Sequence, residues 1–239
     1  MKAMIFAAGL GTRFKPWTDQ HPKALAIVNG KPLLQRNIEY LQQYGITDVV
    51  VNVHHFADQI MEAVEKNRGW GSRILISDES DVVLETGGGL LKAKSLLGDE
   101  RFLTLNVDIL TNLNLEKLFQ THMQQKAVVS LAVAQRETSR FLLFDSENRL
   151  CGWRNIKGDE VLEKIAVPAP AYVQKAYSGI ALFENTIWQQ IPFTGKFSLI
   201  DVFLHAASTQ KILGYDHTGD DWVDVGRLES VAVAENLFS

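Results

Sequence analysis

The chain has very little cysteine: Cys151 is the single one among 239 residues. One cysteine excludes an internal disulfide and a metal site built from clustered cysteines. Because disulfides persist mainly in oxidising compartments, this composition fits a reducing cytoplasm, and we expect a cytoplasmic protein.

Long apolar runs and basic blocks are also absent. No uninterrupted apolar stretch approaches the roughly 20 residues that a membrane-spanning helix needs, so we expect no membrane partner. Lys and Arg together number 24 and Asp and Glu 28, without a cluster of one sign. Nucleic acid is therefore not an expected partner either.

The chain does contain apolar residues in two spacings, one typical of strands and one typical of helices, which alternate along the sequence. Its hydrophobic content of 46% is enough for one well-buried domain. Short strand-like apolar runs alternate with segments of helical spacing through the first half, which indicates βαβ units. We predict an α/β fold with a doubly wound, mostly parallel sheet and helices on both faces. The predicted strands there are 3–7, 49–53, 73–77, 102–106 and 127–134, and the helices are 32–44, 57–66, 89–97 and 115–124.

The pattern changes after Ser139. A hairpin of 141–144 and 149–153, a long strand 172–183 interrupted by Gly179, and short strands 212–215 and 222–225 indicate a small β-rich insertion. Helices are expected at 198–208, behind Ser198 as its N-cap, and at 227–237.

A glycine-containing loop follows the first predicted strand. Glycine lets the backbone bend and approach a ligand closely, and backbone N–H groups in such a loop can face phosphate oxygens. Arg13 and Lys23 add positive charge. The dinucleotide fingerprint fails because Phe14 stands where its third glycine belongs, and no Walker A sequence occurs. The loop is predicted to hold a polyphosphate.

Two aspartates complement this loop. Asp108 follows a strand, at the edge of the sheet where α/β proteins bind ligands, and Asp224 alternates with apolar neighbours. Mg²⁺ takes oxygen ligands, usually one or two carboxylates with phosphate oxygens and water. We therefore predict Asp108 and Asp224 as ligands of Mg²⁺. Ordinary turn and edge-strand aspartates are the alternative interpretation.

Taken together, the motif resembles the signature of sugar-phosphate nucleotidyltransferases. The matching residues are Gly9, Gly11, Thr12, Arg13, Pro16, Pro22 and Lys23. The resemblance implies a Rossmann-like fold in one domain, residues 1–239, with a nucleotide-binding half (1–138) and a sugar-binding half (139–239). It also implies Mg²⁺-dependent nucleotidyl transfer, with a nucleoside triphosphate and a sugar 1-phosphate as partners and Arg13, Lys23 and Asp108 as catalytic residues. Oligomeric state stays open.

The resemblance extends to three further segments. The run Leu84–Gly89 is predicted as a second glycine loop, packing against base and ribose. The amino-acid sequence of this run, like that of residues 222–226, is similar to the sequences of bacterial N-acetylmuramate 1-phosphate uridylyltransferases. The implied nucleotide-binding residues are Ala8, Gly9, Gly11, Thr12, Arg13, Glu85, Thr86, Gly87 and Gly88, and the implied sugar-binding residues are Asn106, Glu163 and Gly179. A surface ion pair is the alternative for Glu163 and Lys164, and Ile165 departs from the proline that relatives carry there.

Other functions remain open at this stage. A mannose-1-phosphate guanylyltransferase or a cytidylyltransferase acting on a phosphorylated alcohol such as phosphocholine would use the same motif. A nucleotide-sugar sensor without catalysis would keep the fold, although the intact Arg13, Lys23, Asp108 and Asp224 argue against it. A dehydrogenase is disfavoured by Phe14.

Overall fold

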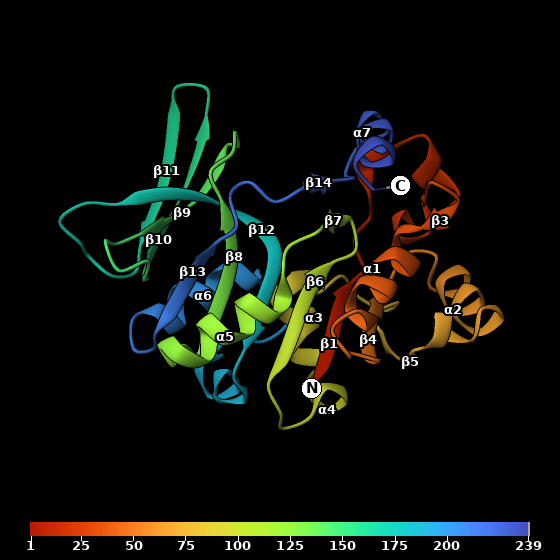
Figure 1. Cartoon of the computed structure of the whole chain (residues 1–239), viewed down its shortest axis with the longest axis horizontal. Helices are drawn as coiled ribbons and strands as arrows, with labels where there is room; N and C mark the ends of the chain where they lie inside the picture. Colours follow the sequence, from red (N-terminus) through yellow and green to blue (C-terminus); the bar gives the residue numbers. More distant parts are fainter. Residues whose placement is uncertain (239) are drawn as a thin grey trace.

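The computed structural model describes residues 1–238, and a ten-stranded mixed sheet runs through it (Figure 1). Its strands are β1 (Lys2–Phe6), β4 (Asp48–Val53), β5 (Arg73–Asp78), β6 (Phe102–Asn106), β8 (Val129–Ala134), β9 (Arg140–Phe144), β10 (Leu150–Lys157), β11 (Glu160–Ile165), β12 (Val173–Phe183) and β13 (Ile212–Asp216). The neighbouring order is β11-β10-β9-β12-β6-β1-β4-β5, and β8 joins β12 to β13. Two small pairs complete the strands: β2 (Ile27–Val28) with β3 (Lys31–Pro32), and β7 (Ile109–Thr111) with β14 (Trp222–Asp224).

Helices connect these strands. The α-helices are α1 (Leu33–Gln42), α2 (Ala57–Lys66), α3 (Glu85–Lys92), α4 (Lys94–Leu97), α5 (Leu115–Gln125), α6 (Leu199–Ala207) and α7 (Glu229–Leu237). Short 3-10 helices are η1 (Thr12–Phe14), η2 (Trp17–Asp19), η3 (Lys23–Leu25), η4 (Arg68–Gly71) and η5 (Asn185–Gln190). Within residues 1–238, no helix combines the length and apolar character that a membrane crossing requires.

The sheet has a parallel part and an antiparallel part. Strands β6, β1, β4 and β5 pair in parallel, as the alternating sequence pattern predicts. Strand β12 pairs antiparallel with β6, β8 and β9, and β10 and β11 continue that direction outward. The β9–β11 strands extend away from the parallel part in Figure 1. The α/β class with a mostly parallel core and a β-rich insertion is confirmed.

Helices cover both faces, because alternate residues of a strand point to opposite sides. On β1, Ala3 and Ile5 belong to the apolar cluster that includes side chains of α1, α2 and α5. Met4 and Phe6 belong to the cluster with α3, α4 and α6. Both clusters are almost fully buried and cross the boundary between the two predicted halves of the chain.

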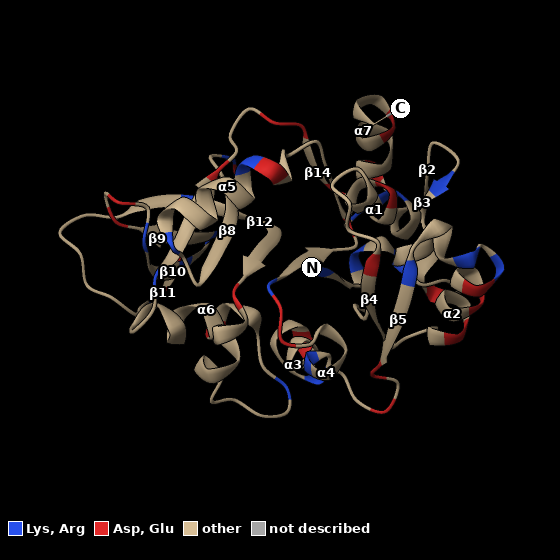
Figure 2. Ribbon diagram, turned by 60° about the horizontal axis from the view of Figure 1, so that its bottom comes forward, with Lys and Arg blue, Asp and Glu red and all other residues tan. Residues whose placement is uncertain are grey.

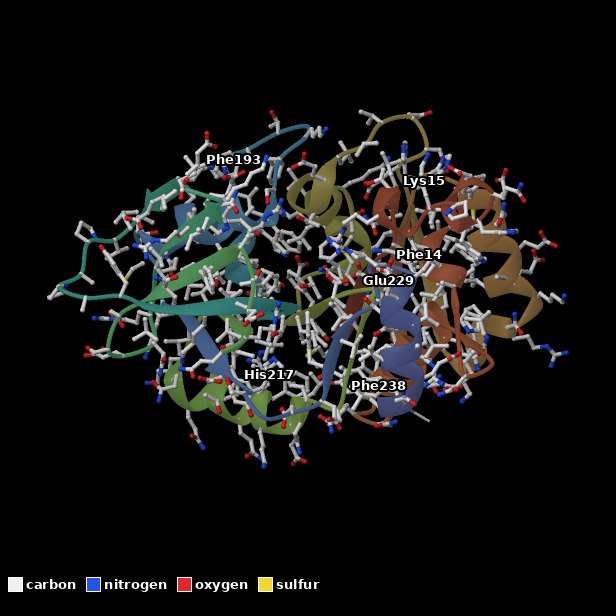
Figure 3. All side chains as sticks on the ribbon, turned by 90° about the horizontal axis from the view of Figure 1, so that it is seen from above. Phe14, Lys15, Phe193, His217, Glu229 and Phe238 are labelled. Atoms are coloured by element: carbon white, nitrogen blue, oxygen red, sulfur yellow. The ribbon has the colours of Figure 1, made fainter. Side chains whose placement is uncertain are left out.

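A third, smaller core anchors the C-terminal helix over the N-terminal loop. Phe14, Val225 and Ala234 are buried together there. Figure 3 shows Phe14 beside the start of α7 at Glu229, with Lys15 following it along the loop. Burial of Phe14 therefore fixes the end of the loop that carries Arg13.

Most element predictions are confirmed, but not all of them. The helix 57–66 and the strand 102–106 match their predicted bounds, and Ser198 caps α6 by accepting a hydrogen bond from Ile200 N. The predicted loop Leu84–Gly89 is wrong, since α3 already begins at Glu85. No element is predicted for the segment containing Glu163, which forms the strand β11. The strand β7 was not predicted at all.

Tight packing explains the glycines of α3. A Cβ at Gly87 would lie 2.4 Å from the Phe197 ring, and one at Gly88 would lie 2.2 Å from the carbonyl oxygen of Gly195. These glycines are therefore needed for close approach of helix and loop, not for a flexible turn.

Candidate active site

The Gly9–Arg13 loop leaves the carboxyl end of β1 and turns sharply at Gly11. Gly11 has a φ of +61°, and a Cβ there would lie 2.8 Å from Thr18 Cγ2. Its carbonyl oxygen accepts hydrogen bonds from Phe14 N, at 2.8 Å, and Thr18 Oγ1, at 2.9 Å. Thr12 begins η1 and is exposed. Only glycine suits this position, both for its backbone angle and for lack of space.

The two charged residues of the motif each meet one of the predicted metal aspartates. Lys23 Nζ forms an ion pair with Asp108 Oδ2, and both side chains are largely buried. Arg13 Nη2 lies 3.8 Å from Asp224 Oδ2 in a more exposed pair. The structure thus brings together four residues from three distant parts of the chain.

The small pair of β7 and β14 is what brings the two aspartates close. Asp224 lies opposite Ile109 in this antiparallel register, and Val225 N donates to the Asp108 carbonyl oxygen at 2.8 Å. Burial raises the pKa of Asp224, and the carboxylate of Asp108 raises it further, against the lowering effect of Arg13, Lys23 and Arg136. Two carboxylates that repel each other in this way favour a cation between them.

The donor set fits a magnesium ion. Asp224 Oδ1 is buried and has no hydrogen-bond partner among the described residues. No group of three or more His, Cys, Asp or Glu side chains within residues 1–238 could hold a metal. An ion at Asp108 and Asp224 would therefore complete its shell with phosphate oxygens and water, which is the usual arrangement for Mg²⁺.

A main cavity of about 590 Å³ opens beside this pair. Several predicted site residues line it: Arg13, Thr86, Asn106, Asp108, Gly179 and Asp224. Gly179 interrupts β12 with a φ of +79°, and a Cβ there would lie 3.0 Å from Asn106 Nδ2. A glycine at this point keeps the cavity wall free of a side chain.

A second cavity of about 170 Å³ lies between the Gly9 loop and α3. Ala8, Gly9, Glu85 and Thr86, all predicted to contact nucleotide, line it, and Thr86 also lines the main cavity. Gly87 and Gly88 are buried in α3 instead.

Sequence reasoning missed two buried polar residues of this second cavity. Asn52 Oδ1 accepts from Ala7 N at 2.7 Å, and Asn52 Nδ2 donates to Glu79 Oε1 at 2.8 Å. Desolvation raises the pKa of Glu79 despite the Asn52 hydrogen bond. Both residues follow or end parallel strands, β4 and β5, which is the signal that also indicated Asp108.

Glu163 lies apart from the other sugar-side candidates. It is not among the residues lining the main cavity, and its carboxylate pairs with Arg154 across β10 and β11. Lys164 Nζ is 3.0 Å from Asp201 Oδ1. Both contacts are of the surface type that the alternative interpretation described.

Sequence reasoning also missed the basic residues of the main cavity. Arg136 and Arg140 line it together with the aromatic side chains of Trp153, Tyr177 and Trp222. Arg140 begins β9 and Arg136 lies in the segment before it, and no sequence motif marks either arginine.

Known proteins match this chain over almost its whole length. The family model described as Nucleotidyl transferase matches residues 2–238. An N-acetylmuramate alpha-1-phosphate uridylyltransferase of Neisseria meningitidis is 31% identical over 99% of this chain and 98% of its own length. A protein of the same name from Caulobacter vibrioides is 32% identical over 98% and 95%.

Solved structures show the same fold. The crystal structure of HddC from Yersinia pseudotuberculosis, complexed with GMP-PN, covers 100% of this chain and 99% of its own, with a TM-score of 0.78 at 23% identity. With a family match over residues 2–238, a motif loop and two facing aspartates, the chain belongs to the nucleotidyl transferase family and is a nucleotidyltransferase.

Proposed function

We propose that this enzyme transfers a uridylyl group from UTP to an N-acetylmuramate-type sugar 1-phosphate with Mg²⁺ as cofactor, releasing pyrophosphate. The observation that carries the proposal is the pairing of Lys23 with Asp108 and of Arg13 with Asp224 at the main cavity, whose lining includes Arg13 and both aspartates. The names of the relatives from Neisseria and Caulobacter support UTP and the muramate-type sugar.

The proposed reaction is an in-line displacement at phosphorus. An oxygen of the sugar 1-phosphate forms a bond to the α-phosphorus of the triphosphate, and the bond from that phosphorus to the bridging oxygen of pyrophosphate breaks. The nucleophile is already ionised at neutral pH, so no general base is needed. Catalysis then depends on positioning and on charge stabilisation.

Each charged residue has a distinct role in this proposal. The Gly9–Arg13 loop holds the triphosphate, Arg13 neutralises the leaving pyrophosphate and Lys23 contacts the α-phosphate. Asp108 and Asp224 hold Mg²⁺, which supplies positive charge to the phosphate oxygens when bound.

In the same proposal, each half of the chain binds a different substrate. Residues 1–138 contribute the small cavity for base and ribose, with Ala8, Gly9, Glu85 and Thr86. Residues 139–239 contribute the sugar side around Gly179, with Asn106 reaching in from β6. Such a substrate implies a role in recycling cell-wall sugars in the cytoplasm.

The first test measures pyrophosphate release with a panel of nucleoside triphosphates and sugar 1-phosphates. We expect UTP with N-acetylmuramate 1-phosphate to be the best pair, and EDTA to abolish turnover until Mg²⁺ is restored. Asp108→Ala should remove turnover while the protein stays folded, whereas Asp159→Ala, an exposed turn aspartate, should not.

Three results would contradict the proposal. Full turnover of Asp108→Ala would remove the metal assignment. Best turnover of GTP with mannose 1-phosphate, or of CTP with phosphocholine, would replace the substrates. Binding of a nucleotide-sugar, seen as a raised melting temperature, without any pyrophosphate release would indicate a sensor.

A further inference from the structure

Two of the arginines that line the main cavity have no acidic partner. Arg13 lies near Asp224, but Arg136 and Arg140 have no carboxylate within ion-pair distance among the described residues. The proposed roles of Lys23, Arg13 and the two aspartates do not use them. Figure 2 shows basic and acidic residues interspersed along the ribbon of the molecule.

Arg136 is held rigidly although it lacks a counter-ion. Its guanidinium carbon lies 3.9 Å from the ring centroid of Trp222, and Nη2 donates to the Tyr177 carbonyl oxygen at 2.8 Å. Trp222 is itself fixed, because its Nε1 donates to the Ser178 carbonyl oxygen at 3.0 Å. Stacking and one hydrogen bond therefore orient the guanidinium before any ligand arrives.

Most of the hydrogen-bonding capacity of Arg136 is unused. A guanidinium carries five N–H donors, and Nε is buried without a partner among the described residues. Burial lowers the pKa of Arg136 by more than the carboxylate of Asp224 raises it, so this cation has lost water without gaining a full counter-charge. A buried charge that is only partly compensated is costly, and a bound anion would offset the cost.

Arg140 offers a second cation on the same cavity. It begins β9, is exposed, and its side chain makes no hydrogen bond or ion pair with the described residues. Thr138 and Ser139, between the two arginines, also line the cavity and add hydroxyl groups. This cluster lies on the connection from β8 to β9 and shares the main cavity with Arg13, Asp108 and Asp224, to which the proposed phosphate chemistry assigns other roles.

We propose that the sugar substrate carries a carboxylate in addition to its 1-phosphate, and that Arg136 and Arg140 bind this carboxylate and set specificity for acidic sugars. The inference rests on the proposed function and extends it to particular residues. A planar carboxylate suits the fork of a guanidinium, which can bind both oxygens at once. The lactyl group of N-acetylmuramate 1-phosphate is such a carboxylate.

The test compares N-acetylmuramate 1-phosphate with its carboxamide, which keeps the shape and removes the charge. The wild-type enzyme should show a kcat/KM that is about 10- to 100-fold higher for the acid, as expected for hydrogen bonds to a charged group. Arg136→Met and Arg140→Met should lose most of this preference and keep the activity on the carboxamide. Arg140→Lys should recover part of it, since the charge remains.

Arg149→Met is the matched control. Arg149 lies just past β9 in the same region, but it pairs with Asp145 and does not line the main cavity. Its variant should keep the wild-type preference. If Arg136→Met fails to fold because Trp222 loses its partner, Arg140→Met and Arg140→Lys carry the test alone.

Two outcomes would overturn the inference. Equal kcat/KM of the wild type on acid and carboxamide would show that the carboxylate is not recognised. An equal loss on both substrates in the Met variants would assign the arginines to a shared group such as the 1-phosphate. Both outcomes leave uridylyl transfer intact, whereas failure of the proposed function would appear as no pyrophosphate release with any substrate pair.

Discussion

At the residue scale, the two ion pairs of the site differ in how firmly they are held. The side chains of Lys23 and Asp108 are only 13% and 14% exposed, whereas those of Arg13 and Asp224 are 58% and 38% exposed. An exposed pair is weakened by solvent, and its side chains stay free to rearrange. In the proposed mechanism, Lys23 is therefore a preorganised cation, and Arg13 is free to move onto an incoming phosphate.

A substitution of Lys23 tests this preorganisation. Lys23→Met should lower kcat for nucleotidyl transfer by about 10²- to 10³-fold, the usual loss when one group that stabilises developing charge is removed. Steady-state pyrophosphate release measures the effect. Lys31→Met, in an exposed pair with Glu39 away from the cavity, should stay within twofold of wild type. Equal rates for the two variants would contradict the role of Lys23.

At the scale of single elements, helix α3 shows how packing can reverse a local preference. Three consecutive glycines disfavour a helix by about 1 kcal/mol each relative to alanine. They are tolerated because the chain at Gly195 and Phe197 approaches the helix more closely than a Cβ would permit. The contact also sets the position of Thr86, whose Oγ1 accepts from Leu199 N at 3.0 Å.

Gly88→Ala should therefore destabilise the protein despite the better helix propensity of alanine. The new Cβ would lie 2.2 Å from a backbone oxygen, and overpacking of this kind costs about 1–3 kcal/mol. In a chain of this size each kcal/mol lowers Tm by about 2–4 °C. Gly9→Ala, which has nothing within 4 Å, is the control for stability. A Tm of Gly88→Ala at or above that of wild type would refute the packing explanation.

At the scale of the whole molecule, buried histidines join separate parts of the fold. His122 of α5 contacts Ser130 Oγ of β8 at 2.8 Å and Glu184 Oε1 at 3.1 Å. His217 follows β13 and contacts Ser178 Oγ of β12 at 2.7 Å. Burial lowers the pKa of both histidines, against the raising effects of Glu184 on His122 and of Asp220 and Asp216 on His217.

This predicts a pH dependence of stability with a definite sign. Because the folded state resists protonation of these rings, their contribution is complete above the unfolded pKa of about 6.5 and is lost as the pH falls below it. The unfolding free energy should decrease by at most about 1.4 kcal/mol per pH unit for each histidine. Denaturant titrations between pH 7.5 and 5.5 measure it.

Variants separate these histidines from other groups. His122→Gln should be less stable at pH 7.5 and show a shallower slope, whereas His21→Gln, at an exposed position, should keep the wild-type slope. The pKa values of Asp145 and Asp216 are lowered by hydrogen bonds that outweigh desolvation, so their contribution is lost only below about pH 4. An unchanged slope in His122→Gln would contradict the prediction.

The sequence by itself determined the parallel half of the fold and the family motif. Local patterns sufficed there: short apolar runs indicated β1, β4 and β6, and the spacing from Gly9 to Lys23 predicted a loop for phosphate. These signals depend on residues close together in the chain, which is why they are readable without a structure.

Tertiary structure alone decided what surrounds that motif. The register of β7 with β14 places Asp224 beside Asp108. The close approach of Gly195 explains why a run of glycines lies in the helix α3. Stacking on Trp222 holds Arg136 in the wall of the main cavity. Each of these depends on contacts between distant segments, whose energies are set by burial and close packing and have no counterpart in local sequence.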